Sequence, residues 1–493
     1  MEHPISSRAR WSTFIFVALL GLAVRLPQLG ERPMHTDEAV NAYIIGQLLS
    51  GEPFNYDPQD RHGPALSALT LPLAGIQGAR SFSDLTESEL RLAPVIAGTV
   101  TILLFGVATE FFGFLPCLIA ALLFAFGPLP VYYDRYFIHE SLFCAATFGL
   151  ILSGWCAATT HSRTNTALAG ACAALMLASK ETAVIHFVAL AAALIAFRFW
   201  RRPDQPLHPW MPSRTLLLGA GVFLALSLLL YTWFGRDWKA IPALLHAAPH
   251  LFSRAAGQGH QKPLLYFARL LTDDWSGTSI LALACIGIVL SIRRRSASPY
   301  VIVAIYFVLI AATYSLIPYK TPWLALNLWL PIALFAGCAL DSLWSAMLKR
   351  TSTKAAIPVF SITAVIIAAM IARDTRQRVF LHPAGETNPY AYAHTTEDIL
   401  GLPTEISELA RRDGIANPRI AVIASDPWPL PWYLRHFSQV GFWQPGQQPG
   451  KADFYITSTD VAEQYRDQLR DYHADFFGVR PGVLILLWLP VPK

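Results

Sequence analysis

Met34-His35-Thr36-Asp37-Glu38-Ala39 follows the first long apolar segment of the chain, which runs from about residue 11 to residue 29. The stretch sets a histidine and two adjacent carboxylates at the point where the chain would leave a lipid bilayer. A run of helix-forming residues, 40–49, comes next. Thr36 or Asp37 therefore stands where a helix N-cap belongs, and Glu38 falls in the first turn. By itself the stretch indicates a well-capped surface helix, because caps are far commoner than active sites.

Composition sets the class of the whole chain. The 493 residues are 54% hydrophobic and only 14% charged, and the mean hydropathy is +0.40. Soluble domains carry roughly a quarter charged residues, so the sequence is that of a membrane protein. The net charge of +5 comes from basic residues in short loops and not from an extended basic patch, which argues against a nucleic-acid partner.

Apolar segments long enough, or nearly long enough, to span a bilayer recur about eleven times. They lie near residues 11–29, 92–112, 114–133, 139–160, 164–179, 182–200, 213–234, 278–293, 299–318, 322–348 and 355–372. The segment 63–78 is also apolar, but two prolines and a glycine interrupt it, which favours a re-entrant or interfacial piece. The sequence therefore predicts a polytopic α-helical membrane domain, residues 1–372, with extracytoplasmic loops at 30–91 and 235–277.

The basic residues predict how the chain is oriented. Arg8 and Arg10 precede the first apolar segment and no small-x-small cleavage site follows it, so we expect a retained first helix. With the N-terminus in the cytoplasm, every basic loop falls on the inner side, as the positive-inside rule requires. These loops contain Arg163, Arg198, Arg201, Arg202, Arg293, Arg294, Arg295, Lys349, Arg350 and Lys354. An odd number of spans then places the C-terminus outside.

After about residue 373 the composition becomes that of a soluble domain. The expected elements are helices at 402–412 and 461–469 and strands at 419–425, 452–458 and 483–489. They predict a small extracytoplasmic α/β domain, residues 373–493. The stretch 426–432, Asp-Pro-Trp-Pro-Leu-Pro-Trp, follows its first strand, where sites of α/β domains tend to form. A packed Pro/Trp loop is an equally good interpretation of that stretch.

Ionisable residues of the predicted outer loops lie within a residue or two of helix ends, so they could face one cavity at a shared depth. Such positions are costly unless the charges are paired or solvated, and they often mark function. The set comprises Asp37, Glu38, Asp134, Arg135, His139, Glu140, Lys180, Glu181 and Lys320. For Lys180 and Lys320 the alternative is that each side chain simply reaches the membrane interface.

A carboxylate near a cluster of basic groups suits removal of a proton from a hydroxyl beside a phosphate leaving group. Lysine and arginine would hold and neutralise that phosphate. A helix N-terminus at Asp37 would keep its carboxylate ionised. His35, Glu38, His139 and Glu140 could also hold a divalent metal ion, although no spacing here demands one.

Several stretches resemble known membrane enzymes. Residues 22–26 (LAVRL) followed by 35–39 (HTDEA) resemble the start of the GT-C integral-membrane glycosyltransferases, which include protein O-mannosyltransferases and aminoarabinose transferases. A narrower similarity is to the family described as flippase-activity-associated proteins of archaea and bacteria. It rests on residues 56–58 (YDP), 62–64 (HGP), 135–140 (RYFIHE), 179–183 (SKETA), 319–323 (YKTPW) and 428–433 (WPLPWY). The ordered set covers nearly the whole chain.

This resemblance implies an enzyme of a prokaryotic cell membrane, the inner one where there are two, that uses a polyprenyl-phosphate sugar as donor. Asp37 matches the acidic residue of the first loop treated as catalytic, with Glu38 beside it. Glu140, or otherwise Asp134, takes the place of the acidic residue of the second loop. Arg91 looks like the arginine at the start of the second span. His62 and Glu181 lie in the matching stretches and are further site candidates.

We therefore expect transfer of a sugar from a polyprenyl-phosphate donor to a hydroxyl of a lipid, glycan or protein on the outer face. Asp37 would act as general base, with Glu38 and Glu140 shaping the site. The candidates for binding the donor phosphate are Arg91, Arg135, Lys180 and Lys320. A flippase or flippase accessory for lipid-linked sugars is the alternative, but it would need polar residues through the bilayer midplane. A third possibility is a scaffold that binds a cell-wall complex through its C-terminal domain.

Overall fold

The computed structural model describes residues 6–59, 61–200, 212–246, 249, 260–293 and 299–490. It divides into two compact units. The first unit comprises residues 1–27, 53–70 and 91–381, and the second comprises 28–52, 71–90 and 382–493. Two segments of the predicted loop 30–91 thus belong to the same compact unit as the C-terminal residues.

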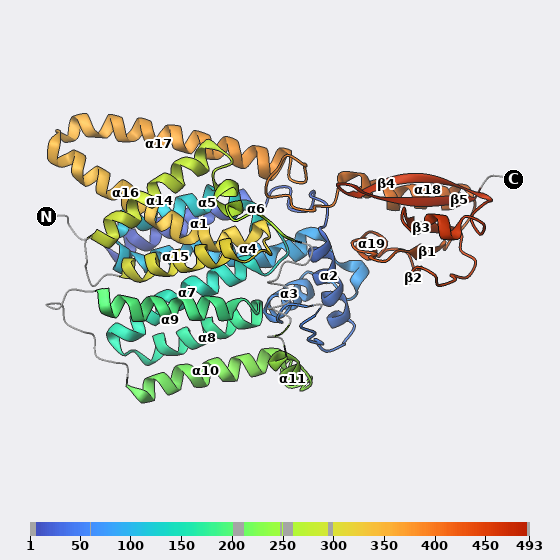
Figure 1. Ribbon diagram of the computed structural model, residues 1–493, viewed down its shortest axis with the longest axis horizontal. Coiled ribbons are helices and arrows are strands. Elements are labelled where there is room, and N and C mark those ends of the chain that lie inside the picture. The colour runs from blue at the N-terminus through green and yellow to red at the C-terminus, as the bar shows by residue number, and fades with distance from the viewer. Residues whose placement is uncertain are drawn as a thin grey trace. The chain divides into compact units, whose positions relative to one another are not determined.

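Helices occupy all eleven predicted positions (Figure 1). They are α1 (Ser7–Arg25), α4 (Glu87–Phe112), α5 (Phe114–Phe126), α7 (Glu140–Thr160), α8 (Arg163–Ser179), α9 (Ala183–Trp200), α10 (Ser213–Tyr231), α14 (Trp275–Arg293), α15 (Pro299–Leu316), α16 (Ala325–Arg350) and α17 (Thr353–Thr375). Among the described residues, eight helices are long and apolar enough to cross a membrane, so the chain is a multi-pass membrane protein. The predicted count of eleven spans is not confirmed, because α5, α8 and α9 are not among these eight.

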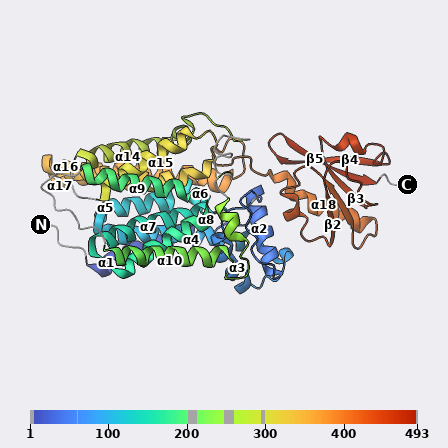
Figure 2. The same ribbon diagram turned by 60° about the horizontal axis from the view of Figure 1, so that its bottom comes forward.

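The helices of the first unit pack closely through small residues. A Cβ at Gly170 of α8 would lie 2.3 Å from the carbonyl oxygen of Gly219 in α10, and one at Gly337 of α16 would lie 2.3 Å from that of Pro116 in α5. Backbones approach this closely in membrane bundles only where a side chain is missing. Figure 2 shows α7, α8, α9 and α10 running alongside one another.

Short helices connect the long ones. Helix α5 ends at Gly127-Pro128, and α6 (Pro128–Tyr133) begins there with proline in its first turn and leads to the stretch 134–140. Helix α3 (Ala65–Ile76) forms in the interrupted segment 63–78. The loop 235–277 holds α11 (Ala240–Leu245) and α13 (Tyr266–Leu271), while residues 247–248 and 250–259 of it lie outside the described residues. Arg201, Arg202, Arg294 and Arg295 also lie outside them, and the orientation of the chain stays a prediction.

The C-terminal part of the second unit is a five-stranded sheet in the order β2-β1-β3-β5-β4. Its strands are β1 (Arg419–Ile423), β2 (Gln439–Trp443), β3 (Phe454–Ser458), β4 (Tyr472–Arg480) and β5 (Val483–Pro490). The pairs β1–β2 and β1–β3 are parallel, and β3–β5 and β4–β5 are antiparallel. The predicted helix at 402–412 is confirmed as α18 (Leu402–Arg412).

One predicted element of this domain is wrong. Residues 461–469 form turns around a short 3-10 helix, η5 (Ala462–Tyr465), and not an α-helix. The apolar spacing at Val461, Tyr465 and Leu469 is real, because all three side chains are buried in one cluster with β1 and β3. Turns bury these side chains as well as a helix would. The strands β2 and β4 were not predicted, because their half-buried residues show no clean alternation.

Candidate active site

The second unit contains the stretch that begins α2 (Thr36–Leu49). Its N-cap is His35 and not Thr36 or Asp37: the main-chain N–H of Asp37 donates to His35 Nδ1 at 3.0 Å. The main-chain N–H of His35 in turn donates to Glu38 Oε2 at 3.1 Å, which completes a capping box. Burial lowers the pKa of His35, although the charges of Asp37 and Glu38 oppose that shift. The imidazole is therefore neutral at pH 7, and only the neutral ring can accept at Nδ1.

The two adjacent carboxylates have different environments. Glu38 is fully buried, and besides the cap its Oε1 lies 3.5 Å from the Arg32 guanidinium. Asp37 is half-buried, and among the described residues its carboxylate has no hydrogen-bond or ion-pair partner. It stands in the first turn of a helix, where exposed N–H groups favour a negative charge. Glu38 is thus committed to the local structure, whereas Asp37 is available to accept a proton.

In the first unit, Asp134 forms a buried ion pair with Arg25. The Arg25 Nη2 lies 2.7 Å from Asp134 Oδ2, and both side chains are completely buried. The guanidinium also donates to the carbonyl oxygens of Gly21, Phe124 and Ala125 at 2.9–3.0 Å. Burial raises the pKa of Asp134, and the charge of Arg25 opposes that shift. The pair therefore ties α1 to the end of α5 and to the turn after α6.

Arg135 was predicted to bind the donor phosphate. In the structure its guanidinium donates hydrogen bonds at the C-terminal end of α1. Its Nη1 donates to the carbonyl oxygens of Arg25 at 2.8 Å and Pro27 at 2.5 Å, and its guanidinium lies 4.8 Å from the centre of the Phe380 ring. These contacts satisfy carbonyls at the C-terminus of α1, as a cation at a helix end does. Arg91, the other predicted arginine, is fully buried in α4.

A second group in the first unit joins the loop 53–64 to the α8–α9 turn. Lys180 forms a buried salt bridge with Glu140 at the start of α7. Burial lowers the pKa of Lys180, but the charge and hydrogen bond of Glu140 outweigh it, so the pKa lies above the ordinary value. Glu140 and Lys180 were predicted to play separate roles, and the structure joins them in one ion pair.

Glu181, the next residue, holds a histidine and a tyrosine. Its Oε1 accepts from the Tyr56 hydroxyl at 2.9 Å, and its Oε2 lies 3.0 Å from His62 Nδ1. Burial alone would raise the pKa of Glu181, but His62, its own backbone and Tyr56 together lower it to about 2. The carboxylate orients the imidazole, whose side chain is 36% exposed, and His139 packs edge-on against that ring at 5.2 Å. His139 itself is buried, and burial lowers its pKa well below the ordinary value.

Lys320 lies between α15 and α16 and is 1% exposed. Its Nζ donates to the carbonyl oxygens of Ile317 at 2.5 Å and Lys262 at 3.2 Å, and burial lowers its pKa. Among the described residues it has no carboxylate partner. Its neighbour Tyr319 acts electrostatically on Lys180, so the two lysine-bearing turns lie close together.

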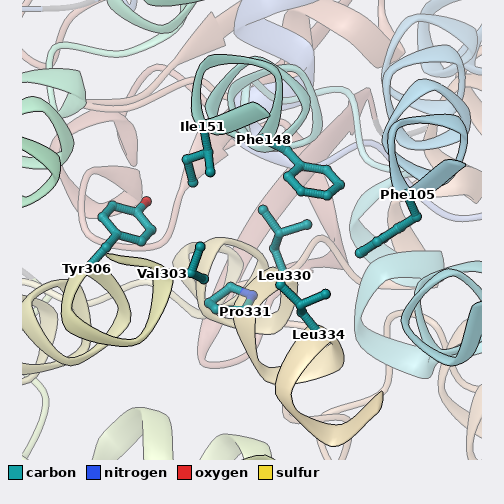
Figure 3. A pocket seen from close by; sticks show the side chains of 8 residues that line it. All are labelled: Phe105, Phe148, Ile151, Val303, Tyr306, Leu330, Pro331 and Leu334. Carbon is teal, nitrogen blue, oxygen red and sulfur yellow. The ribbon is translucent and has the colours of Figure 1, made fainter. Parts of the chain in front are cut away.

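Among the described residues, neither a metal site nor the pocket shown in Figure 3 adds a second reactive site. In the part of the chain that the structure describes, no group of three or more His, Cys, Asp or Glu side chains is arranged to hold a metal ion. His35 and Glu38 already spend atoms on the α2 cap, so a metal ion stays a prediction. The pocket in Figure 3 is lined by apolar side chains such as Phe105, Phe148 and Leu330, with one hydroxyl from Tyr306. That hydroxyl bonds His186 Nδ1 at 2.7 Å, and the pocket carries no polar chemistry.

Sequence reasoning missed three residues that complete these groups: Arg25, Arg32 and Tyr56. Arg25 and Tyr56 stand inside stretches that carry the family resemblance, at residues 22–26 and 56–58. Their partners lie 109 and 125 residues away along the chain, so nothing in the local pattern could identify the pairing.

Comparison with solved structures shows that the fold is that of the GT-C glycosyltransferases. The family model of dolichyl-phosphate-mannose-protein mannosyltransferases matches residues 77–231, less than half of the chain. The crystal structure of ArnT from Cupriavidus metallidurans bound to undecaprenyl phosphate is similar in fold, with a TM-score of 0.66, 14% identity, 97% of this chain and 99% of that chain covered. No curated protein sequence matches the chain.

Two further solved structures are similar in fold. The oligosaccharyltransferase AglB from Archaeoglobus fulgidus, in complex with an inhibitory peptide and a dolichol-phosphate, has a TM-score of 0.57 and 13% identity, with 98% of this chain and 76% of that chain covered. The mycobacterial arabinofuranosyltransferase AftD has a TM-score of 0.50 and 14% identity, with 100% and 40% covered. At these identities the likeness concerns the fold.

Proposed function

We propose that the chain is a glycosyltransferase that moves a sugar from a polyprenyl-phosphate donor to a hydroxyl acceptor on the outer face of the membrane. The observation that carries the proposal is the difference between Asp37 and Glu38. One carboxylate is locked into a capping box and an ion pair, while its neighbour is held by the same cap without a partner among the described residues. A general base needs this arrangement, because it must be fixed in place and still free to accept a proton.

The chemistry follows from that assignment. The acceptor hydroxyl gives its proton to Asp37 as its oxygen forms a bond to the anomeric carbon. The bond between that carbon and the phosphate oxygen breaks, and the electron pair leaves with polyprenyl phosphate. Negative charge therefore grows on the phosphate in the transition state, and fixed cations or N–H donors would stabilise it.

Within the first unit, Lys320 and His62 are the residues best suited to bind a phosphate. Lys320 is a buried ammonium group that bonds only carbonyl oxygens among the described residues, so a phosphate would improve its electrostatic environment. The Nδ1–H of His62 donates to Glu181, so its Nε2 can donate to a phosphate when the ring is protonated on both nitrogens. Lys180 is already neutralised by Glu140, so its role would be to shape the site. The structures of ArnT with undecaprenyl phosphate and AglB with dolichol-phosphate support a polyprenyl phosphate as the carrier.

The proposal is tested with the full-length protein in detergent, wild type and Asp37→Asn, using synthetic undecaprenyl-phosphate hexoses and pentoses and a membrane extract as acceptor. Release of undecaprenyl phosphate should fall about 10²–10⁴-fold in Asp37→Asn, as expected for loss of a general base. Glu31→Gln, an exposed carboxylate of the same segment, is the matched control and should keep wild-type turnover. Wild-type turnover in a correctly folded Asp37→Asn variant would overturn the assignment. Movement of intact donor across vesicles without release of lipid phosphate would favour a flippase instead.

A further inference from the structure

The loop after β1 occupies the position where parallel sheets usually bind ligands. Strand β1 pairs with β2 on one side and with β3 on the other, so the chain reverses direction across the sheet at β1. The crevice at the carboxyl end of such a strand is the common ligand site of α/β domains. Here the residues that follow β1 lead into α19 (Leu430–Tyr433), and this helix contacts α2 and the segment before it.

The first contact holds the main chain of Met34, the residue before the N-cap. The N–H of Met34 donates to the Tyr433 hydroxyl oxygen at 2.8 Å, and the Thr395 hydroxyl donates to the Met34 carbonyl oxygen at 2.7 Å. Met34 is completely buried. Both polar groups of one buried peptide residue are therefore satisfied by side chains from the C-terminal domain, about 360–400 residues further along the chain.

A second contact fixes the next part of the same loop. The Trp432 indole N–H donates to Glu87 Oε1 at 2.8 Å, and the Arg435 Nε donates to the Leu85 carbonyl oxygen at 3.3 Å. The Arg435 guanidinium also stacks over the Trp432 ring, 3.7 Å from its centre. Trp432 is completely buried, so these hydrogen bonds lie in an environment where losing a partner is costly.

Aromatic rings complete the attachment. The rings of Tyr43 in α2 and Trp428 lie 5.8 Å apart, and the ring of the N-cap residue His35 packs edge-on against that of His394 at 5.6 Å. The N-cap and the middle of the helix that carries Asp37 thus both touch the C-terminal domain. The helix itself has only 14 residues and would be marginal without tertiary contacts.

We propose that the C-terminal domain is part of the catalytic apparatus, and that Tyr433 and Thr395 are positioning residues that set the place of Asp37 by holding the Met34 peptide. The inference rests on the proposed function of Asp37. It assigns the 428–433 stretch, Trp-Pro-Leu-Pro-Trp-Tyr, to this task and not to binding a separate small ligand. Met34 lies three residues before Asp37, so a rotation of its peptide passes directly into the first turn of α2.

The test uses Tyr433→Phe, Thr395→Val and their double variant in the full-length protein. Tyr465→Phe is the matched control, because its hydroxyl also bonds a main-chain N–H and a carbonyl oxygen, those of Gly446 and Gln447, but inside the C-terminal domain. We expect each single variant to lower kcat by about 3–10-fold and the double variant by about 30–100-fold, with KM for the donor within about twofold, as a misplaced base predicts. Hydrogen exchange of the peptide covering residues 32–38 should accelerate at least about tenfold in Tyr433→Phe and stay unchanged in Tyr465→Phe.

The outcomes separate the inference from the function on which it rests. If Asp37→Asn abolishes transfer while Tyr433→Phe and Thr395→Val behave like Tyr465→Phe, the positioning role is overturned and the proposed function stands. Unchanged exchange of the 32–38 peptide in Tyr433→Phe would overturn the attachment by itself. Full transfer in Asp37→Asn would overturn the proposed function, and the catalytic part of the inference with it.

Discussion

The Arg25–Asp134 pair allows a catalytic carboxylate to be told apart from a structural one. Sequence reasoning placed Asp134 among the candidates for the acidic residue of the second loop, whereas the structure buries it completely against Arg25. We expect Asp134→Asn and Arg25→Met each to destabilise the protein. Removing one partner leaves the other charge buried without compensation, and this typically costs about 3–5 kcal/mol. Arg25→Met should be the worse of the two, because it also leaves three carbonyl oxygens without their donor.

The double variant Arg25→Met/Asp134→Asn should recover part of that loss, since no buried charge then remains without a counter-ion. A coupling free energy of at least about 2 kcal/mol is expected from the double-mutant cycle. The measurement is the free energy of unfolding in mixed micelles, followed by tryptophan fluorescence, alongside the rate of sugar transfer. If the unfolding free energy of Asp134→Asn lies within about 0.5 kcal/mol of the wild-type value and sugar transfer is nevertheless abolished, Asp134 acts in catalysis and its structural role is refuted.

Two further predictions concern the surroundings of these residues. Gly98→Ala in α4 should destabilise the protein, because a Cβ there would lie 2.1 Å from Asp134 Oδ2. Gly154→Ala in α7 has open space around it and should be neutral or stabilising by up to about 1 kcal/mol. Equal unfolding free energies for the two variants would contradict this. At pH 7 the free energy of unfolding of Glu181→Gln should be about 3 kcal/mol below that of the wild type. This difference corresponds to a pKa of Glu181 lowered from 4.5 to about 2. Because the folded pKa is depressed, the difference from the wild type is fully present above pH 4.5 and should shrink as the pH falls toward 2. A difference that stays constant over that range in denaturation curves would refute the ion-pair explanation.

The positions of the long helices could be predicted from the sequence, because a membrane span needs a long continuous apolar run. Few other structural elements produce an apolar run of that length. Helix α18 was equally clear, since its apolar residues recur at helical spacing. The N-cap was misplaced by one or two residues, because His35 is an uncommon cap whereas Thr36 and Asp37 are common ones. His35 can cap the helix because its Nδ1 is unprotonated, and the ring is neutral because it is buried. No local sequence pattern reveals that burial.

The pairing of the charges was beyond sequence reasoning for a different reason. Lys180, Arg135 and Lys320 look alike in the sequence, each a cation near a helix end. In the structure one is neutralised by Glu140, one closes a helix C-terminus, and the third bonds only carbonyl oxygens among the described residues. The first two outcomes depend on contacts between residues 40 and 110 positions apart, and Lys320 also contacts Lys262, 58 positions away. Helix ends that meet at one depth have many possible pairings, and only packing selects among them.

The pairing of the charges decides which side chains can still interact strongly with a further charged group. A buried charge with a close counter-ion gains little from a substrate, because any new interaction must replace one that already exists. A charge that the fold holds in place without a counter-ion is stabilised most by a new interaction. That stabilisation arises where a reaction places an opposite charge or a mobile proton beside it. Among the described candidates, Asp37 and Lys320 have that character, and Glu38, Asp134, Glu140 and Lys180 do not. The carboxylates and cations that looked equivalent in the sequence therefore divide into those with a counter-ion and those without one among the described residues. The Asp37→Asn and Asp134→Asn variants should fail in opposite ways, the first in turnover and the second in stability.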